Sequence, residues 1–264
     1  MKAYVLFSSS NGNCTYIKNG KEEILIDVGL SAKKISDALI KLGTNLSNIT
    51  SIFITHEHID HIKALNVICR HYRIPIYIPA KSLDFVATSM QWTEELLVEN
   101  SGGAVREFDG LKITAFDTPH DSLGSVCFRI EAEDTTLGYA TDIGHLTSDV
   151  KKSLTGCESV VIESNYDPYM LKNGTYPYAT KQRILGDRGH LSNGECAAFL
   201  PELYKNGTRN FVLAHLSQNN NKPHIALAES RGALGANGIC VCDTFGKADA
   251  RLCAAMPDSI VEII

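Results

Sequence analysis

The sequence ITHEHIDHIKAL, residues 54–65, crowds polar side chains directly behind an apolar run. The residues in it that could bind a metal ion are His56, Glu57, His58, Asp60 and His61. The stretch does not fit the H-E-x-x-H helix of zinc peptidases, because Asp60 stands where the second histidine is required. Three histidines and one aspartate within six residues are hard to explain as an unrelated polar loop, so the stretch predicts a metal site.

Each further candidate ligand also follows a predicted strand. These residues are His120 after LKITAFDTP, Asp142 after TTLGYAT and His215 after RNFVLA. Strand ends are rigid platforms, and the loops beyond them can converge on one edge of a layered structure. Such convergence is what a metal site requires, because imidazole nitrogens must approach zinc to about 2.0–2.1 Å.

Composition narrows the class of protein. The chain has 264 residues, and we expect a single domain over residues 1–264. Its net charge of -5 gives no overall attraction to nucleic acid or to a membrane, so any polyanion site must be a local patch. The apolar run at the N-terminus is too short for a signal peptide, and no run reaches membrane-spanning length. The expected location is therefore the cytoplasm, with no membrane partner.

Eight cysteines are scattered through the sequence, most of them within apolar segments. Without a secretion signal, we expect them to be reduced and to pack as small core residues. Cys240 and Cys242 form a C-V-C pair, but no partner pair follows, so a structural zinc site there is the weaker interpretation.

The pattern of elements predicts two sheets covered by helices. The β-rich segments are residues 2–7, 14–18, 22–29, 51–55, 74–79, 104–109, 111–118, 124–132, 135–142, 159–164, 209–217 and 259–264. Helices are predicted at residues 30–43, 60–72, 192–206 and from 224 onward. Ser192 followed by Glu195 fits a capping box at the start of the third helix.

The motif H-x-H-x-D-H at residues 56–61 resembles the signature of the metallo-β-lactamase superfamily. Four further motifs occur in that family's order: ILIDVG with Asp27, DTPHDS with His120, YATDIG with Asp142 and LAHLS with His215. The resemblance covers nearly the whole chain. It implies an α/β fold of four layers, the αββα sandwich, with two metal ions at one edge and a hydrolase activity.

Within the superfamily, the chain most resembles the WalJ/YycJ-like branch. The segments that carry this resemblance are SSSNGNCTYI, HEHIDHIKAL, NYDPYMLKNGTYPYATKQRILGDRGHLSN and HLSQNN. Ser9 departs from the pattern, which has glycine there, and the departure bears on the geometry of the first turn. The branch implies a cytoplasmic DNA phosphodiesterase of the 5′-to-3′ exonuclease type.

Carried over motif by motif, the resemblance implies a cofactor of two divalent metal ions, zinc or manganese. One ion would be held by His56, His58 and His120, the other by Asp60, His61 and His215, and Asp142 would bridge the two. Asp27 would orient a histidine through its ring N–H instead of binding metal. Glu57 would point away from the metal ions or support the residues that bind them. For His145 two interpretations remain open: its side chain reaches the pocket, or it is an ordinary loop residue.

Three features favour phosphodiester substrates over lactams and thioesters. His190 precedes the helix that opens at Ser192, and helix N-termini favour anions. The same stretch, GHLSN, resembles the GHS segment of tRNase Z-type nucleases. A basic strip with interleaved aromatic residues suits a nucleic-acid backbone and stacked bases, although a solvated helix face explains it equally well. The strip comprises Lys172, Tyr176, Tyr178, Lys181, Arg183 and Arg188.

In the expected mechanism, a hydroxide shared by the two metals attacks phosphorus. Asp60 would accept a hydrogen bond from the hydroxide, and His190 would stabilise charge or protonate the leaving oxygen. Glu163 would hold His190 in a useful tautomer. The residues expected to contact the substrate are Asn13, Lys181, Arg183 and Arg188.

Two alternatives remain open. The first is a hydrolase of a small-molecule ester, thioester or cyclic phosphodiester, although the sequence shows no added helical domain of the glyoxalase II type. The second is a non-catalytic metal-binding scaffold that regulates a partner, against which the complete set of ligands argues. The sequence also leaves open RNA against DNA, and internal against terminal cleavage.

Overall fold

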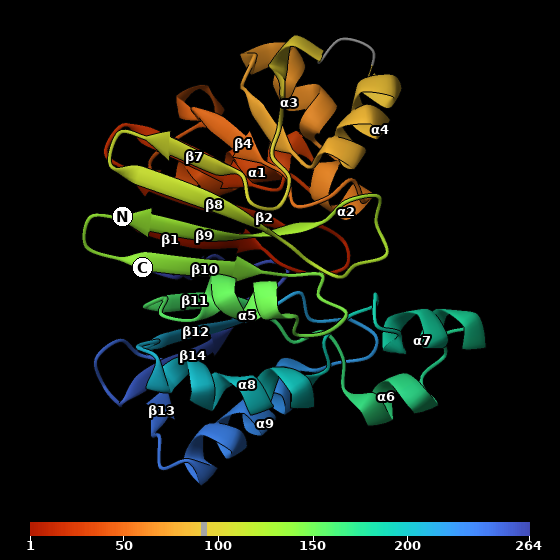
Figure 1. Cartoon of the computed structure of the whole chain (residues 1–264), viewed down its shortest axis with the longest axis vertical. Coiled ribbons are helices and arrows are strands. Elements are labelled where there is room, and N and C mark those ends of the chain that lie inside the picture. Colours follow the sequence, from red (N-terminus) through yellow and green to blue (C-terminus); the bar gives the residue numbers. More distant parts are fainter. Residues whose placement is uncertain (91–93) are drawn as a thin grey trace.

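The computed structural model describes residues 1–90 and 94–264 and has four layers (Figure 1). Two β-sheets pack face to face, and helices cover the outer face of each sheet. The predicted αββα sandwich is therefore confirmed.

The first sheet has the strand order β15-β1-β2-β3-β4-β5-β6. Its strands are β1 (Lys2–Phe7), β2 (Cys14–Asn19), β3 (Glu22–Ile26), β4 (Ser51–Phe53), β5 (Ile76–Ile78), β6 (Leu97–Glu99) and β15 (Val261–Glu262). The second sheet has the order β13-β14-β12-β11-β10-β9-β8-β7. Its strands are β7 (Val105–Phe108), β8 (Leu111–Asp117), β9 (Val126–Ala132), β10 (Thr136–Ala140), β11 (Ser159–Glu163), β12 (Asn210–Ala214), β13 (Val241–Cys242) and β14 (Ala250–Ala254).

The helices fall in the connections between these strands. They are α1 (Ala32–Lys41), α2 (Ile59–Ile62), α3 (Leu65–Tyr72), α4 (Ala80–Met90), α5 (Ser148–Leu154), α6 (Pro168–Asn173), α7 (Tyr178–Leu185), α8 (Asn193–Lys205) and α9 (Pro223–Ala236), with short 3-10 turns at Leu46–Asn48 and Glu94–Leu96. The capping box predicted at Ser192 is present. No helix in the described residues is both long and apolar enough to cross a membrane.

Three apolar clusters hold the layers together. The central cluster lies between the sheets, where Phe53 of the first sheet meets Phe128 of the second with ring centroids 5.7 Å apart, edge to face. A second cluster lies between the first sheet and helices α1, α3 and α4, and a third lies between the second sheet and helices α5, α8 and α9. Each sheet is thus buried on both faces, which explains why its central strands are apolar almost throughout.

The continuous helix predicted at residues 60–72 is wrong, because the chain breaks between α2 and α3. At the break, Val28 N donates to His61 O at 2.8 Å, and Ala64 N donates to Val28 O at 2.9 Å. These backbone groups bond to the turn after β3 instead of continuing the helix. The break separates α2, which carries Asp60 and His61, from the packing helix α3.

All eight cysteines are free. Five of them are buried, as predicted, whereas Cys240, Cys242 and Cys253 are partly or fully exposed. Burial raises the pKa of the Cys127 thiol to about 12, so this side chain packs as a neutral group.

Gly29 marks a close approach of backbone segments beneath the metal-binding stretch. A Cβ atom there would lie 1.6 Å from Asp60 O, and Asn13 N already donates to that oxygen at 2.9 Å. We therefore expect Gly29→Ala to push the Asp60 segment away and to lower the free energy of unfolding by at least about 1–3 kcal/mol, the usual cost of overpacking. Thermal unfolding measures this loss.

Gly232→Ala is the matched control. Gly232 is exposed in α9, and a Cβ atom there would meet nothing within 4 Å. Alanine should raise the free energy of unfolding by about 0.5–1 kcal/mol at a helical position of this kind. Equal stability of the two variants would contradict the close approach at Gly29.

Candidate metal centre

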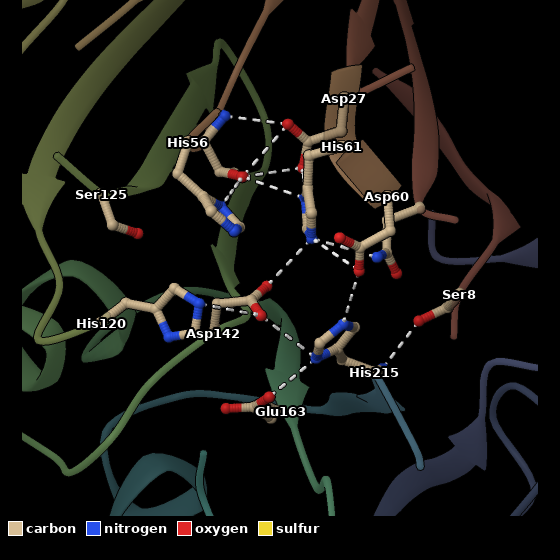
Figure 2. A network of polar contacts seen from close by, with 12 residues as sticks. Ser8, Asp27, His56, Asp60, His61, His120, Ser125, Asp142, Glu163 and His215 are labelled. Atoms are coloured by element: carbon tan, nitrogen blue, oxygen red, sulfur yellow. Dashed lines mark hydrogen bonds and ion pairs between the residues drawn. The ribbon is translucent and has the colours of Figure 1, made fainter. Parts of the chain in front are cut away.

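One edge of the sandwich collects the polar side chains that follow its strands (Figure 2). Strands β10, β11 and β12 run parallel, and β8 runs the same way because β9 is antiparallel to both β8 and β10. Both sheets contribute to this edge. The residues that lie there are Asp27 after β3, His56 after β4, His120 after β8, Asp142 after β10, Glu163 at the end of β11 and His215 after β12.

Three of these residues have a left-handed backbone. The φ angle is 59° at Asp27, 57° at Asp142 and 55° at His215, and only Arg73 shares this conformation among the other non-glycine residues described. Such a residue costs roughly 1–3 kcal/mol and persists where the surrounding structure enforces it, often at functional sites. The turns redirect the chain sharply where each strand ends.

Three histidines form the first part of the centre. Ring nitrogens of His56, His58 and His120 all lie within 4.8 Å of one another. His120 Nδ1 donates to the carbonyl oxygen of Gly189 at 3.1 Å, and His56 Nδ1 contacts Thr55 Oγ1 at 3.0 Å. The Nε2 atoms of His56 and His120 are buried without a hydrogen-bond partner. Buried polar atoms are rarely left unpaired, so these nitrogens fit a metal ion.

The second part of the centre combines Asp60, His61 and His215, whose ligand atoms also lie within 4.8 Å of one another. His61 Nδ1 donates to the buried Asp27 Oδ2 at 2.8 Å, and Thr55 N donates to Asp27 Oδ1 at 2.8 Å. This is the supporting contact predicted for Asp27. It fixes the His61 ring so that Nε2 faces the centre, 3.6 Å from Asp60 Oδ2.

Asp142 lies between the two parts (Figure 2). Its Oδ2 is 3.4 Å from His61 Nε2, and its Oδ1 is 3.7 Å from His120 Nε2. Oδ2 is buried without a hydrogen-bond partner. One carboxylate thus faces both groups of ligands, which is the geometry a bridging ligand needs.

Glu163 holds two histidines with a single oxygen. Its Oε1 accepts from His190 Nδ1 and from His215 Nδ1, both at 2.8 Å. Its Oε2 accepts from the backbone N–H groups of Ile143 at 2.7 Å and Leu191 at 3.1 Å. These four bonds engage both oxygens, an arrangement suited to orienting the two histidines, although Glu163 also belongs to a group with Asp142, His190 and His215 that could hold a metal ion. The predicted meeting of Glu163 and His190 is confirmed.

The charges of the centre favour a bound cation. Burial lowers the pKa of His215, but Asp142, Asp60 and Glu163 outweigh burial and raise that pKa to about 10. Burial raises the pKa of Asp60, but His215 and His61 outweigh it and hold that pKa well below its ordinary value. The ionised carboxylates therefore favour a proton, and with it a positive charge, on the His215 ring. A metal ion would compete with such protons for the same ring nitrogens.

Together, the unpaired ring nitrogens, the facing carboxylates and their supports make a cluster able to hold divalent metal ions. The donors are imidazole and carboxylate groups, which suit zinc and also manganese. The assignment of each ligand, the number of ions and their identity stay predictions.

Glu57, although within the metal-binding stretch, points away from the ligands. Its Oε2 accepts from Ser82 Oγ at 2.6 Å, and its Oε1 accepts from Leu123 N at 2.8 Å. Glu57 therefore ties α4 and the loop after His120 to the stretch that carries the metal ligands.

Asn13 lies beneath the centre and is 1% exposed. Its Nδ2 donates to Ser9 O at 3.1 Å and lies 3.2 Å from His61 Nε2. Ser9 forms the turn where glycine was expected, with its Oγ accepting from Asn11 N at 3.2 Å. Asn13 thus supports this turn and His61, and its predicted contact with substrate stays a prediction.

A pocket of about 260 Å³ opens over the centre, and α7 supplies one wall through Thr180, Arg183 and Ile184. Arg183 forms an ion pair with Asp121, which follows the ligand His120. Of the three basic residues predicted to bind substrate, Arg183 is the one that lines this pocket.

The other two basic residues make backbone contacts. Lys181 Nζ donates to Lys172 O at 2.8 Å. Arg188 donates to His120 O at 2.8 Å and to Ser122 O at 3.1 Å, and so clamps the loop that carries His120. Their predicted contacts with substrate stay predictions.

Several N–H groups at the start of α8, where an anion site was expected, already have partners. Ser192 N donates to Glu195 Oε2 at 3.0 Å, Glu195 N donates to Ser192 Oγ at 3.2 Å, and Asn193 N donates to Tyr166 O at 2.9 Å. The N–H groups of Ser192, Asn193 and Glu195 are therefore already bonded within the protein. This disfavours an anion at the start of α8, and the expected anion site stays a prediction.

Three residues of the site were not singled out from the sequence. Thr55 orients Asp27, Asp121 pairs with Arg183, and Asn165 Nδ2 donates to His215 O at 2.7 Å while lining the pocket. Each is adjacent or close in sequence to a residue that was singled out, which is the signal that could have found it. His145 is exposed and donates from Nδ1 to Asp187 O at 2.9 Å, as a loop histidine would.

Comparison with known proteins agrees with this geometry. The family model of the Metallo-beta-lactamase superfamily matches residues 9–185. The chain therefore belongs to the metallo-β-lactamase superfamily, and its metal cluster is that of a metal-dependent hydrolase.

Two relatives place it more closely. The chain is 31% identical to Exodeoxyribonuclease YycJ of Bacillus anthracis over 91% of this chain and 92% of the relative. It is also 31% identical to Exodeoxyribonuclease WalJ of Streptococcus pneumoniae over 85% of each. The resemblance to the WalJ/YycJ-like branch is thus confirmed. Zn(2+)-bound PqqB from Methylobacterium extorquens shares the fold, with a TM-score of 0.71 over 99% of both chains at 16% identity.

Proposed function

We propose that the protein is a phosphodiesterase that degrades DNA from its 5′ end in the cytoplasm. The observation that carries this proposal is the placement of His190, which lines the pocket over the metal centre while Glu163 holds its Nδ1 at 2.8 Å. Its side chain is 12% exposed, so the ring can meet a substrate. The two relatives named exodeoxyribonucleases support DNA as the substrate and cleavage from an end.

The proposed cofactor is a pair of zinc or manganese ions. The ligands of one are His56, His58 and His120, the ligands of the other are Asp60, His61 and His215, and Asp142 is shared. When bound, such a pair lowers the pKa of water and polarises the phosphoryl group.

The remaining work falls to side chains around the pocket. Asp60, ionised and 20% exposed, accepts a hydrogen bond from the attacking water and keeps it aimed at phosphorus. His190 keeps a proton on Nδ1 toward Glu163, so it serves as the general acid in its doubly protonated form, in which Nε2–H gives its proton to the leaving oxygen. Arg183 binds a phosphate of the strand through its planar guanidinium, with Lys181 and Arg188 adding positive charge nearby.

Metal-loaded protein should shorten linear DNA from the 5′ end. With a 5′ label, the label should appear at once in the smallest product, whereas a 3′ label should give a ladder of decreasing length. Circular single-stranded DNA is the matched control, because it has the same bonds and no end. RNA strands of the same sequence decide between the two nucleic acids.

Each alternative has its own outcome in this assay. Cleavage of the circle would show internal cutting and contradict the terminal mode. Hydrolysis of a small ester, thioester or cyclic phosphodiester without loss of any nucleic acid would support the small-molecule hydrolase. Bound metal without any hydrolysis would support the regulatory scaffold.

A further inference from the structure

Helices α6 and α7 form a hairpin that stands apart from α8 and α9 (Figure 1). Tyr166, Leu171 and Ile184 form a small apolar cluster of their own, and Tyr176 packs against it. This cluster fixes the hairpin separately from the main core. The hairpin is therefore a defined structure beside the pocket, to which α7 contributes a wall.

Two tyrosine rings of this hairpin face solvent. Tyr169 is 76% exposed and Tyr178 is 77% exposed, which makes them the most exposed large apolar side chains in the described residues. An exposed ring adds nothing to the core, and exposed apolar groups beside a pocket are typical of binding surfaces.

The hairpin is also positive in a negative protein. Residues 167–188 contain four Lys or Arg residues and two Asp residues, and Arg183 also pairs with Asp121, so a small positive charge remains here although the whole chain carries a net charge of -5. A local positive patch next to a pocket attracts a polyanion to that place, whereas the negative remainder of the surface does not. Rings and positive charge together match single-stranded nucleic acid, whose bases stack on aromatic side chains.

We propose that the α6–α7 hairpin guides a single strand into the pocket and that one base of the strand stacks on Tyr178. The inference rests on the proposed nuclease function and names the form of its substrate. The strand must be unpaired beside the pocket, because a base within a duplex has no free face for the ring.

The position of Tyr178 sets a length for this contact. Thr180 and Arg183 face the pocket, whereas Tyr178 lies on the solvent side of the same helix. A helix with its side chains is about 10 Å across, so a strand leaving the pocket must extend by about that distance to reach the ring. Substrates shorter than this cannot use Tyr178.

Tyr178→Ala should therefore act on long substrates alone. We expect the ratio of kcat/KM on a twelve-nucleotide oligothymidylate to kcat/KM on bis(p-nitrophenyl) phosphate to fall on the order of tenfold, the effect of losing one stacked base. Tyr178→Phe keeps the ring and should keep the ratio. The same oligothymidylate shortened to a dinucleotide should show no difference between the two variants.

Two variants control for a general effect of truncation. Leu185→Ala removes a 50% exposed side chain from the same helix, and Tyr72→Ala removes a 42% exposed tyrosine from α3. Both should behave as the unchanged protein. An unchanged ratio in Tyr178→Ala, or the same fall in Tyr178→Phe, would overturn the stacking contact.

A binding measurement separates this inference from the proposed function. Fluorescence anisotropy of labelled oligothymidylate, with chelator present to prevent cleavage, should show weaker binding for Tyr178→Ala than for Tyr178→Phe. If unchanged protein cleaves no nucleic acid yet shows this difference, the nuclease function fails and the strand-binding surface stands. If it cleaves DNA while both variants bind equally, the function stands and this inference fails.

Discussion

Asp142→Asn is expected to abolish hydrolysis while leaving the fold intact. Asp142 presents one oxygen to His61 and the other to His120, so in the proposed two-metal centre its replacement would remove the anion that lets two dications lie side by side. The loss should exceed the roughly 10–100-fold that is usual when a group only supports a ligand. Asparagine suits the test because it tolerates the left-handed backbone found here, with φ of 57°.

Metal content and turnover are measured together for this variant. After reconstitution, the metal content should fall from about two equivalents to one or fewer, and turnover of bis(p-nitrophenyl) phosphate should be lost. Asp167→Asn is the control, because it removes a charge at the N-cap of α6 and asparagine caps a helix equally well. Two retained equivalents with normal turnover would show that Asp142 is no bridge.

Glu163→Gln is expected to lower turnover by about 10²–10⁴-fold, the range for losing general acid–base catalysis. The amide has nearly the shape of the carboxylate but cannot accept from two ring N–H groups and two backbone N–H groups at once. His190 and His215 would then lose their shared orientation. Metal affinity should fall as well, by about 10–100-fold, because His215 loses its support.

The two effects are separable by experiment. Saturating metal should restore the part of the loss that comes from His215 and leave the part that comes from His190. Glu23→Gln provides the control: Glu23 is a buried carboxylate that accepts from Tyr16 at 2.9 Å, and it touches no histidine. It should change stability and spare turnover. If saturating metal restored the turnover of Glu163→Gln completely, a catalytic role for His190 would be excluded.

The layers of the fold could be predicted because the central strands are recognisable from their own residues. Segments such as β3 and β11 are apolar runs bounded by turn residues, and their pattern is local. The edge strand β13 has two residues and therefore no period to detect. The break between α2 and α3 could not be predicted, because it depends on bonds to Val28, which is distant in sequence.

The same distinction holds for the candidate site. The stretch at residues 56–61 holds several candidate ligands in one place. The other candidate ligands were predicted from motifs that occur in the same order as in the family that the chain resembles. The partners of charged side chains could not be predicted, because no local pattern shows that Arg188 donates to the carbonyl oxygen of His120. At α8, the predicted capping box itself pairs the N–H groups of Ser192 and Glu195, so it competes with the anion site that we also expected there.

The left-handed strand ends at Asp27, Asp142 and His215 limit how this centre could be moved or redesigned. Copying the side chains alone onto another sandwich would place them on ordinary backbone, where each would leave its strand in a different direction. A recipient scaffold would need the same three turns, and it would have to tolerate roughly 1–3 kcal/mol of strain at each. Mutant libraries at these positions should likewise retain mainly glycine, asparagine, aspartate and histidine, whatever is selected for, because the backbone restricts the choice before the chemistry does.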